Sequence, residues 1–239
     1  MHIYRSENFQ FQTDNIFDGL SPEHLDILTN SSVTHLYKKG EIIFREGGIP
    51  TGIFYVKSGR VKKYKSTQKG DEQIFYICNS GELLGYHALL SEENYPDASA
   101  TIEDSQITFI PKDKFLEVVN ASSLLSNRLL KALAHEFSVF IHNITNLATK
   151  SVRERVALSL LILEEKFQNK GDNKPAEINL SRGDLASMIG TAKETLVRLL
   201  QEFKSEGLIA SDGRIIRILN RRGIMKEANI TGYVSKMGQ

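Results

Sequence analysis

The side chains best suited to specific chemistry lie close together near the end of the sequence. Lys193, Glu194 and Arg198 share the outer face of a predicted helix. An arginine can pair with guanine O6 and N7 through two hydrogen bonds, and a glutamate can accept one from a cytosine amino group. A lysine reaches a phosphate or a guanine as a point charge. Thr195 and Ser187 are placed for backbone phosphates.

Two predicted helices around a tight turn position these side chains. Ser181 is expected to cap the first helix, with Asp184 at its third position. Gly190 permits the left-handed turn that ends it. The second helix is expected to start at Thr191 or Ala192. Its inward residues are predicted to be Leu196, Leu199, Leu200 and Phe203.

A predicted hairpin follows the second helix. Residues 207–209 and 214–218 flank Ser211-Asp212-Gly213, a turn-forming sequence. Two helices followed by such a hairpin indicate a winged helix-turn-helix, the expected site for double-stranded DNA. Phosphate contacts independent of base sequence are expected from Arg217, Arg221 and Arg222. A solvated helix face would show the same charges without the turn glycine and the hairpin.

Charge, composition and cysteine content narrow the classes of protein. From Ser181 onward there are ten basic and six acidic residues, net +4, so the preceding residues carry −3 of a total of +1. No apolar run approaches the ~20 residues that span a bilayer, so we expect a cytoplasmic protein without a membrane partner. Cys78 alone cannot form an internal disulfide or hold a zinc ion or an iron–sulfur cluster. It is interpreted as a buried small hydrophobe.

Short runs rich in β-branched and aromatic residues fill the first half of the sequence. Glycines separate these runs at the spacing of an antiparallel barrel or roll. The predicted strands are residues 41–44, 52–56, 60–64, 73–77 and 106–110. Alternation in residues 61–65 predicts that their lysines point outward.

A long amphipathic helix is predicted from about Leu124 to Lys150. Apolar residues spaced 3, 4, 3, 4, 3 form one stripe along it, as in helices that pair with a second helix. The stripe consists of Leu130, Leu133, Phe137, Phe140, Ile144 and Leu147. Packing on the chain's own β-roll is the alternative. The length of the stripe favours pairing with a second copy, giving a homodimer.

Three ordered blocks resemble the β-roll of the cyclic-AMP receptor protein / fumarate–nitrate regulator (Crp/Fnr) superfamily. They are residues 39–47, 54–59 and 81–85, and the resemblance extends from about Ile16 to Leu219. It implies an α+β fold with an N-terminal antiparallel β-roll, a long dimerisation helix and a C-terminal winged helix-turn-helix. The expected domains are residues 1–120, 121–150 and 151–239. The family's recognition helix carries Arg-Glu-Thr-Val-x-Arg, and here Lys193 replaces the first arginine.

The ligand cassette departs from the family pattern. In the family, a glutamate binds the ribose of the cyclic nucleotide, and an arginine followed by a serine or threonine binds its phosphate. Aligned without gaps, Tyr86 occupies the position of that glutamate, Pro96 that of the arginine, and Asp97 that of the serine or threonine. No arginine or lysine occurs between Gly70 and Pro111. Burying a phosphate in a pocket without a positively charged side chain costs roughly several kcal/mol of binding free energy, which is enough to abolish binding. We therefore expect that cyclic AMP does not control the protein.

The function of the altered cassette stays open at this point. Tyr86, His87, Asp97 and Phe140 could line a pocket for a cationic or neutral effector, or the segment could be an exposed loop without a ligand. We expect no cofactor, no metal site and no catalytic residues. A catalytic cupin-type roll would need a His-x-His or His/Glu cluster, which the roll lacks.

Two interactions with other proteins remain as sequence-based expectations. The resemblance implies that an activator would contact RNA polymerase, and family position suggests residues 168–176 for that contact. The alternative function is a ligand-sensing regulatory module that acts through a protein partner. Failure of the C-terminal region to bind DNA at low salt would favour it.

Overall fold

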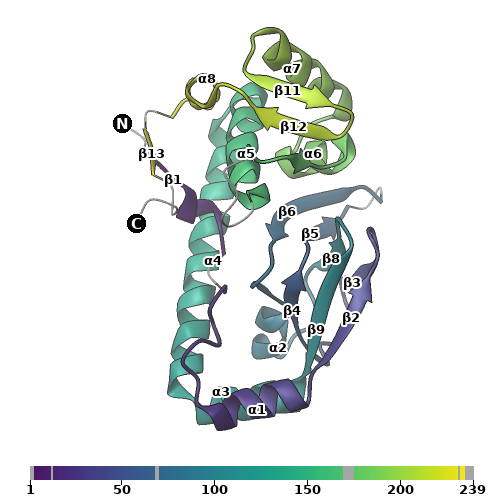
Figure 1. Cartoon of the computed structure of the whole chain (residues 1–239), viewed down its shortest axis with the longest axis vertical. Helices are drawn as coiled ribbons and strands as arrows, with labels where there is room; N and C mark the ends of the chain where they lie inside the picture. Colours follow the sequence, from purple (N-terminus) through teal and green to yellow (C-terminus); the bar gives the residue numbers. More distant parts are fainter. Residues whose placement is uncertain (1–2, 12, 68–69, 169–174, 231, 235–239) are drawn as a thin grey trace. The chain divides into compact units, whose positions relative to one another are not determined.

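A computed structural model of the chain describes residues 3–11, 13–67, 70–168, 175–230 and 232–234. It forms two compact units (Figure 1). One comprises Phe11–Ser138, and the other comprises Met1–Gln10 together with Val139–Gln239. Helix α4 (Ser123–Thr149) therefore contributes residues to both. The expected domain boundaries lie after residues 120 and 150, whereas the two compact units meet after residues 10 and 138.

The first unit contains two four-stranded antiparallel sheets. One has the order β2-β9-β4-β7, formed by Val33–Tyr37, Ser105–Pro111, Gly52–Ser58 and Leu83–Leu84. The other has the order β3-β8-β5-β6, formed by Ile42–Phe44, Ala98–Thr101, Val61–Ser66 and Glu72–Cys78. This confirms the predicted antiparallel roll. Strands β2, β7 and β8 were not among the predicted runs.

Helices close the core of the roll. They are α1 (Pro22–Asn30), α2 (Tyr86–Ser91), α3 (Lys112–Ala121) and the first part of α4. Ser21 caps α1 by accepting a hydrogen bond from the His24 amide, and Pro22 occupies the first turn. Buried Leu125 and Leu129 of α4 join Phe115 of α3 in one apolar cluster. Helix α2 lies within the cassette and was not predicted.

One inward-facing lysine corrects the sequence analysis. All lysines of residues 61–65 were expected to point outward, yet the Lys63 side chain is only 3% exposed. Val61 and Lys63 share the inward face by strand alternation, and Lys63 pairs in register with Ser99. The register with β6 shifts between Lys63 and Tyr64, so Tyr64 is buried as well. The expectation was wrong because the core tolerates an ammonium that has a buried carboxylate partner.

The second unit is a winged helix-turn-helix with additional elements. Its helices are α5 (Val152–Phe167), α6 (Arg182–Ile189), α7 (Lys193–Ser205) and α8 (Arg221–Glu227). Its three-stranded sheet has the order β10-β12-β11, formed by Ile178–Asn179, Ile215–Ile218 and Ile209–Asp212. Figure 1 shows the β11–β12 hairpin beside α6 and α7. This confirms the two helices around the tight turn and the hairpin predicted from the sequence.

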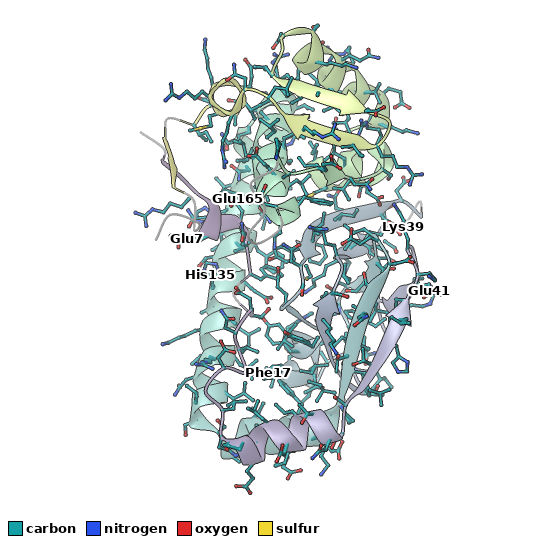
Figure 2. All side chains as sticks on the ribbon, in the orientation of Figure 1. Glu7, Phe17, Lys39, Glu41, His135 and Glu165 are labelled. Carbon is teal, nitrogen blue, oxygen red and sulfur yellow. The ribbon has the colours of Figure 1, made fainter. Side chains whose placement is uncertain are left out.

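The N-terminal segment belongs to this second unit and not to the roll. Strand β1 (Ile3–Arg5) pairs in parallel with β13 (Gly232–Val234). After the short 3-10 helix Ser6–Phe9, the side-chain Nε2 of Gln10 donates a 2.9 Å hydrogen bond to the carboxylate of Glu165 on α5, which Figure 2 labels. Residues 3–10 thus extend the second unit, although the expected domain boundaries placed them with the roll.

Candidate DNA-binding surface and ligand site

The turn between α6 and α7 has the predicted geometry. The Ser181 hydroxyl accepts a 2.9 Å hydrogen bond from the Asp184 amide and thereby caps α6. Gly190 ends α6 with φ +71°, in the left-handed region that side chains disfavour. Helix α7 begins at Lys193, with Ala192 as its N-cap residue. Short-range interactions therefore set the angle at which α7 leaves the turn.

Helix α7 presents a charged face opposite its buried one. Leu196, Leu199, Leu200 and Phe203 are buried, as predicted. Lys193, Glu194 and Arg198 are exposed, and Thr195 is half-buried. The Arg198 guanidinium pairs with Glu202 one turn later, which orders its side chain along the helix surface. The first two turns of α7 can thus bring the side chains of Lys193, Glu194 and Arg198 to the base edges in a DNA groove.

Arg182 holds the hairpin against α6, a contact that the sequence analysis missed. Its guanidinium donates hydrogen bonds to the Gly213 carbonyl at 3.0 Å, the Arg214 carbonyl at 3.2 Å and the Ser211 hydroxyl at 3.0 Å. Burial lowers the pKa of Arg182, but a guanidinium remains charged at neutral pH. One side chain therefore fixes the wing relative to the helix-turn-helix.

The other predicted phosphate contacts have differing surroundings. Ser187 on α6 is half-buried, and Arg222 is exposed. Arg217 donates a 3.0 Å hydrogen bond from Nε to Glu177, so a phosphate would compete with that carboxylate. Arg221 lies 3.3 Å from a Glu164 oxygen. Arg222 is therefore better placed than either for a phosphate.

Two arginines at the start of α5 connect the elements of this unit. Arg155 donates to the Lys150 carbonyl at 2.9 Å and to the Ile189 and Gly190 carbonyls at 3.1 Å each. It therefore joins the end of α4 to the turn of the helix-turn-helix. A Cβ on Gly190 would lie 3.2 Å from Leu147 of α4, so the two segments pack closely.

Arg153 fixes α5 against α7 and α8. Its guanidinium bonds Glu227 at 2.6 Å, Glu202 at 2.8 Å and Glu206 at 2.7 Å, and lies 4.6 Å from the Phe203 ring centre. Burial alone would lower the pKa of Arg153. Its hydrogen bonds to the carboxylates of Glu227 and Glu206 outweigh burial, so the pKa of Arg153 is raised. Together with Arg155, it connects the start of α5 to α7, α8 and the turn between α6 and α7.

A buried polar cluster occupies the interior of the roll. The Lys63 ammonium lies 3.4 Å from one Asp97 oxygen, and His87 Nε2 lies 3.5 Å from the other. Burial would raise the pKa of Asp97, but the Lys63 charge, aided by His87, outweighs it and lowers the pKa. Burial would lower the pKa of Lys63, but the Asp97 and Glu136 charges outweigh it and raise the pKa. The pair is therefore ionised in the folded protein.

Two tyrosine–glutamate pairs border this cluster. The buried Tyr86 hydroxyl donates to the Glu136 carboxylate, which comes from α4. Burial raises the pKa of Glu136, and it also raises the pKa of Tyr86 far above its ordinary range. Tyr76 donates a 2.8 Å hydrogen bond to Glu82. Neither Lys63 nor Glu136 was predicted, because no local pattern assigns an isolated charge to a core.

Several buried polar atoms of the cluster lack a hydrogen-bond partner among the described residues. They are both Asp97 carboxylate oxygens, His87 Nδ1 and Ser99 Oγ. The ion pairs of Asp97 are longer than the ~2.7–2.9 Å of a close charge-assisted hydrogen bond. Unsatisfied polar atoms of this kind are suited to a water molecule or a polar ligand. Within the described ranges, no group of His, Cys, Asp and Glu side chains could hold a metal ion.

The predicted pocket residues divide between the two units. Tyr86, His87 and Asp97 lie together in the roll, so the cassette is not an exposed loop there. Phe140 belongs to the second unit. Cys78 is fully buried, as expected. Residues 168–176 were suggested for contact with RNA polymerase, and most of this segment, residues 169–174, lies outside the described residues.

The stripe predicted on α4 is largely uncovered. Leu130, Phe137 and Ile144, spaced by seven residues, are 66%, 67% and 65% exposed. Leu147 and the unpredicted Ile141 are each 49% exposed, whereas Leu133 and Phe140 are half-buried. The alternative expectation, packing of the stripe on the roll, does not hold for the three heptad-spaced residues. No helix in the described part of the chain is long and apolar enough to cross a membrane.

Comparison with known proteins identifies both units. Residues 34–122 match the cyclic nucleotide-binding domain family, and residues 154–227 match the Crp-like helix-turn-helix domain family. Electron transport regulator A of Shewanella oneidensis is 30% identical over 184 residues, covering 77% of this chain and 73% of that protein. The chain belongs to the Crp/Fnr family. The fumarate and nitrate reduction regulatory protein of Vibrio cholerae is 27% identical over 195 residues, covering 81% of this chain and 78% of that protein.

Solved structures of Crp/Fnr regulators share the fold. A transcriptional regulator of this family from Eubacterium rectale superposes with a TM-score of 0.72 at 23% identity, covering 90% of this chain and 97% of that one. FixK2 from Bradyrhizobium japonicum gives 0.72 at 23% identity, covering 82% and 96%. The Crp/Fnr relatives are transcription regulators and not enzymes, so this chain is a DNA-binding transcription regulator.

Proposed function

We propose that this regulator binds DNA as a homodimer through the apolar stripe of α4. Leu130, Phe137 and Ile144 expose large apolar side chains at heptad spacing, and this single observation carries the proposal. Contiguous exposed apolar surface on a soluble helix is costly unless a partner covers it. A second copy offers the same stripe in a symmetric interface.

Two copies paired in this way can place two α7 helices on one side of a DNA duplex. Their separation would match one helical turn, about 34–36 Å, which requires a palindromic site. Within each half-site, Glu194 is assigned to a cytosine and Arg198 to a guanine. Lys193 supplies a phosphate contact or a weaker guanine contact. Thr195, Ser187 and Arg222 supply phosphate contacts, as does Arg217 where a phosphate displaces Glu177.

We further propose that cyclic AMP does not control binding. Pro96 stands where the resemblance places the phosphate arginine. Lys63, the cation of the roll cluster, already pairs with Asp97, and Glu136 lies in the same network. A phosphate entering there would meet two carboxylates before it gained a cation. Calorimetric titration with cyclic AMP should show no binding, and a micromolar or tighter complex would contradict the proposal.

Selection of bound sequences from a random DNA pool tests the proposed recognition. Purified, ligand-free protein should enrich a two-fold symmetric sequence, and Arg198→Ala should lose base preference in each half-site. Arg222→Ala is the matched control, because Arg222 is an exposed arginine outside α7. It should lower affinity for all sequences without changing the enriched site. Enrichment of an asymmetric site, or none at low salt, would contradict the proposal.

Light scattering on size-exclusion fractions tests the dimer separately. The wild-type chain should elute with the mass of two copies of 26.9 kDa. Phe137→Glu places a charge on the exposed stripe and should give monomers. Lys131→Glu, a change at an exposed position of the same helix, should stay dimeric. A dimeric Phe137→Glu variant would assign the interface elsewhere.

A further inference from the structure

A cavity of about 300 Å³ lies within the second unit, apart from the roll and its cassette. It is lined by the N-terminal segment, the last two turns of α4 with the following Lys150, the middle of α5, and Ile230, three residues after the end of α8. This volume is at the lower end of the range for small-molecule sites, about 300–1,000 Å³. Phe9 and Leu158, both buried, give it an apolar wall.

The two charged side chains among the lining residues are both basic. Arg5 and Lys150 line the cavity, and no aspartate or glutamate is among its lining residues, all of which the structure describes. The carboxylate of Glu7, labelled in Figure 2, does not line the cavity but lies 3.7 Å from the Arg5 guanidinium, and both side chains are exposed. Lys150 donates a 2.8 Å hydrogen bond to the Ala228 carbonyl, which holds its ammonium at the cavity. Two permanent cations beside an apolar wall favour a small anion with an apolar part.

Neutral polar groups on one face of α4 complete the lining. His142, Thr145, Asn146 and Thr149 follow the spacing i, i+3, i+4 and i+7, so they share one face of the helix. The His142 ring also contacts the Phe9 ring at 5.8 Å between centroids. These groups can donate hydrogen bonds to a carboxylate while the ring packs on an apolar ligand body.

The cavity face of α4 is not the face proposed for the dimer. At about 100° per residue, Thr145 and Thr149 lie roughly 100–140° around the helix from Ile144, and His142 lies about 160° from it. Phe137 and Ile141 lie within about 60° of Ile144. A partner helix on the apolar stripe would therefore leave the cavity open.

We propose that this cavity is a binding site for a small organic anion, a carboxylate with an aromatic or compact apolar body. Arg5 and Lys150 pair with the carboxylate, and Phe9 and Leu158 contact the apolar part. The proposal goes beyond the proposed function, since it requires neither DNA binding nor a ligand in the roll. It assigns a role to the N-terminal segment, which supplies Arg5 and Phe9.

Benzoate and its neutral counterpart benzamide are matched probes for this site. Backbone amide NMR of the deuterated, ¹⁵N-labelled full chain would be followed during titration with each probe at constant ionic strength. Benzoate should cause saturable shifts confined to residues 5–9 and 142–150 and to the neighbourhoods of Leu158 and Ile230, and benzamide should bind at least several-fold more weakly. Equal binding of both probes, or no saturable shift in these segments, would overturn the proposal.

Variants of the two cations make the test specific. Arg5→Gln and Lys150→Gln should each weaken benzoate binding several-fold or more, whereas Lys131→Gln, on α4 but outside the cavity, should not. Arg5 is exposed, so its substitution should leave folding intact even if the Lys150 variant is less stable. Benzoate affinity unchanged in Arg5→Gln would contradict the assigned site.

Discussion

The Lys63 ammonium lies 3.4 Å from the Asp97 carboxylate inside the β-roll, and both side chains are almost completely buried. Lys63 lies on β5, and Asp97 directly precedes β8, the strand that pairs with β5. The two residues are thus brought together by strand pairing and not by closeness in the sequence. Buried charges are tolerated only when they are paired. The pair therefore constrains what the roll can bind and how the roll responds to substitution.

Removal of one partner of this pair should strongly destabilise the protein. Lys63→Met leaves the Asp97 charge buried without its ammonium, at an expected cost of about 3–5 kcal/mol in the free energy of unfolding. Lys63→Met combined with Asp97→Leu should cost less than the sum of the two single changes, by about 1 kcal/mol or more. Urea unfolding of the four proteins measures this coupling, and strictly additive losses would show that the pair is not coupled.

Glu136 should make stability depend on pH in the direction opposite to a surface carboxylate. Burial raises its pKa in the folded state above the ordinary 4.5. The folded protein therefore holds a proton that the unfolded chain has released, and this contribution to stability is lost as pH rises through the folded-state pKa. Each proton changes the free energy of unfolding by at most about 1.4 kcal/mol per pH unit.

Comparison of Glu136→Gln with the wild type from pH 4.5 to 7.5 isolates this contribution. The variant cannot titrate, so its free energy of unfolding relative to the wild type should increase as pH rises over this range. Glu117→Gln, at an exposed position of α3, is the control and should show no such trend. A difference that falls with pH, or does not change, would contradict the raised pKa.

Lys193→Arg should strengthen base recognition. An arginine there matches the Crp/Fnr recognition pattern and can pair with a guanine through two hydrogen bonds, whereas a lysine acts as a point charge. Discrimination for guanine at that position should increase by about 1–3 kcal/mol. Fluorescence anisotropy on the selected site and on single-base variants measures the change. Lys226→Arg, on the exposed surface of α8, should leave discrimination unchanged.

Arg182→Gln should loosen the wing without unfolding the helix-turn-helix. It removes three hydrogen bonds to residues 211–214, each worth about 0.5–1.5 kcal/mol before a discount for partial exposure. Hydrogen exchange of amides in β11 and β12 should accelerate several-fold, while α7 stays protected. The control Arg214→Gln changes an exposed arginine of the same hairpin and should not alter exchange. Unchanged exchange in Arg182→Gln would show that the wing is held by its strands alone.

Elements set by neighbouring residues could be predicted from the sequence. Ser181 and Gly190 define the ends of α6, and the apolar periodicity of α7 identified its buried face. Each of these signals depends on residues within one or two helical turns. The Crp/Fnr resemblance supplied the order of the domains and the departure at Pro96.

Features set by distant residues could not be predicted in this way. The inward position of Lys63 depends on its register with Ser99, 36 residues later, and on the irregularity beside it in the pairing with β6. Arg155 bonds carbonyls of Ile189 and Gly190, and Arg182 bonds carbonyls of the hairpin. Every residue has a backbone carbonyl, whatever its side chain, so no pattern of side chains in the sequence identifies these contacts.

The pairing of β1 with β13 has a consequence for the order of events during synthesis. Ile3 pairs with Gly232, so ribosomes must add more than two hundred residues after β1 before its partner strand exists. At about 5–20 residues per second, this interval is on the order of ten to fifty seconds. The roll can fold during that time, but the cavity lined by Arg5 and Phe9 can be complete only after translation has passed Ile230, just before β13. Anion binding at that cavity would thus require a nascent chain translated at least as far as Ile230.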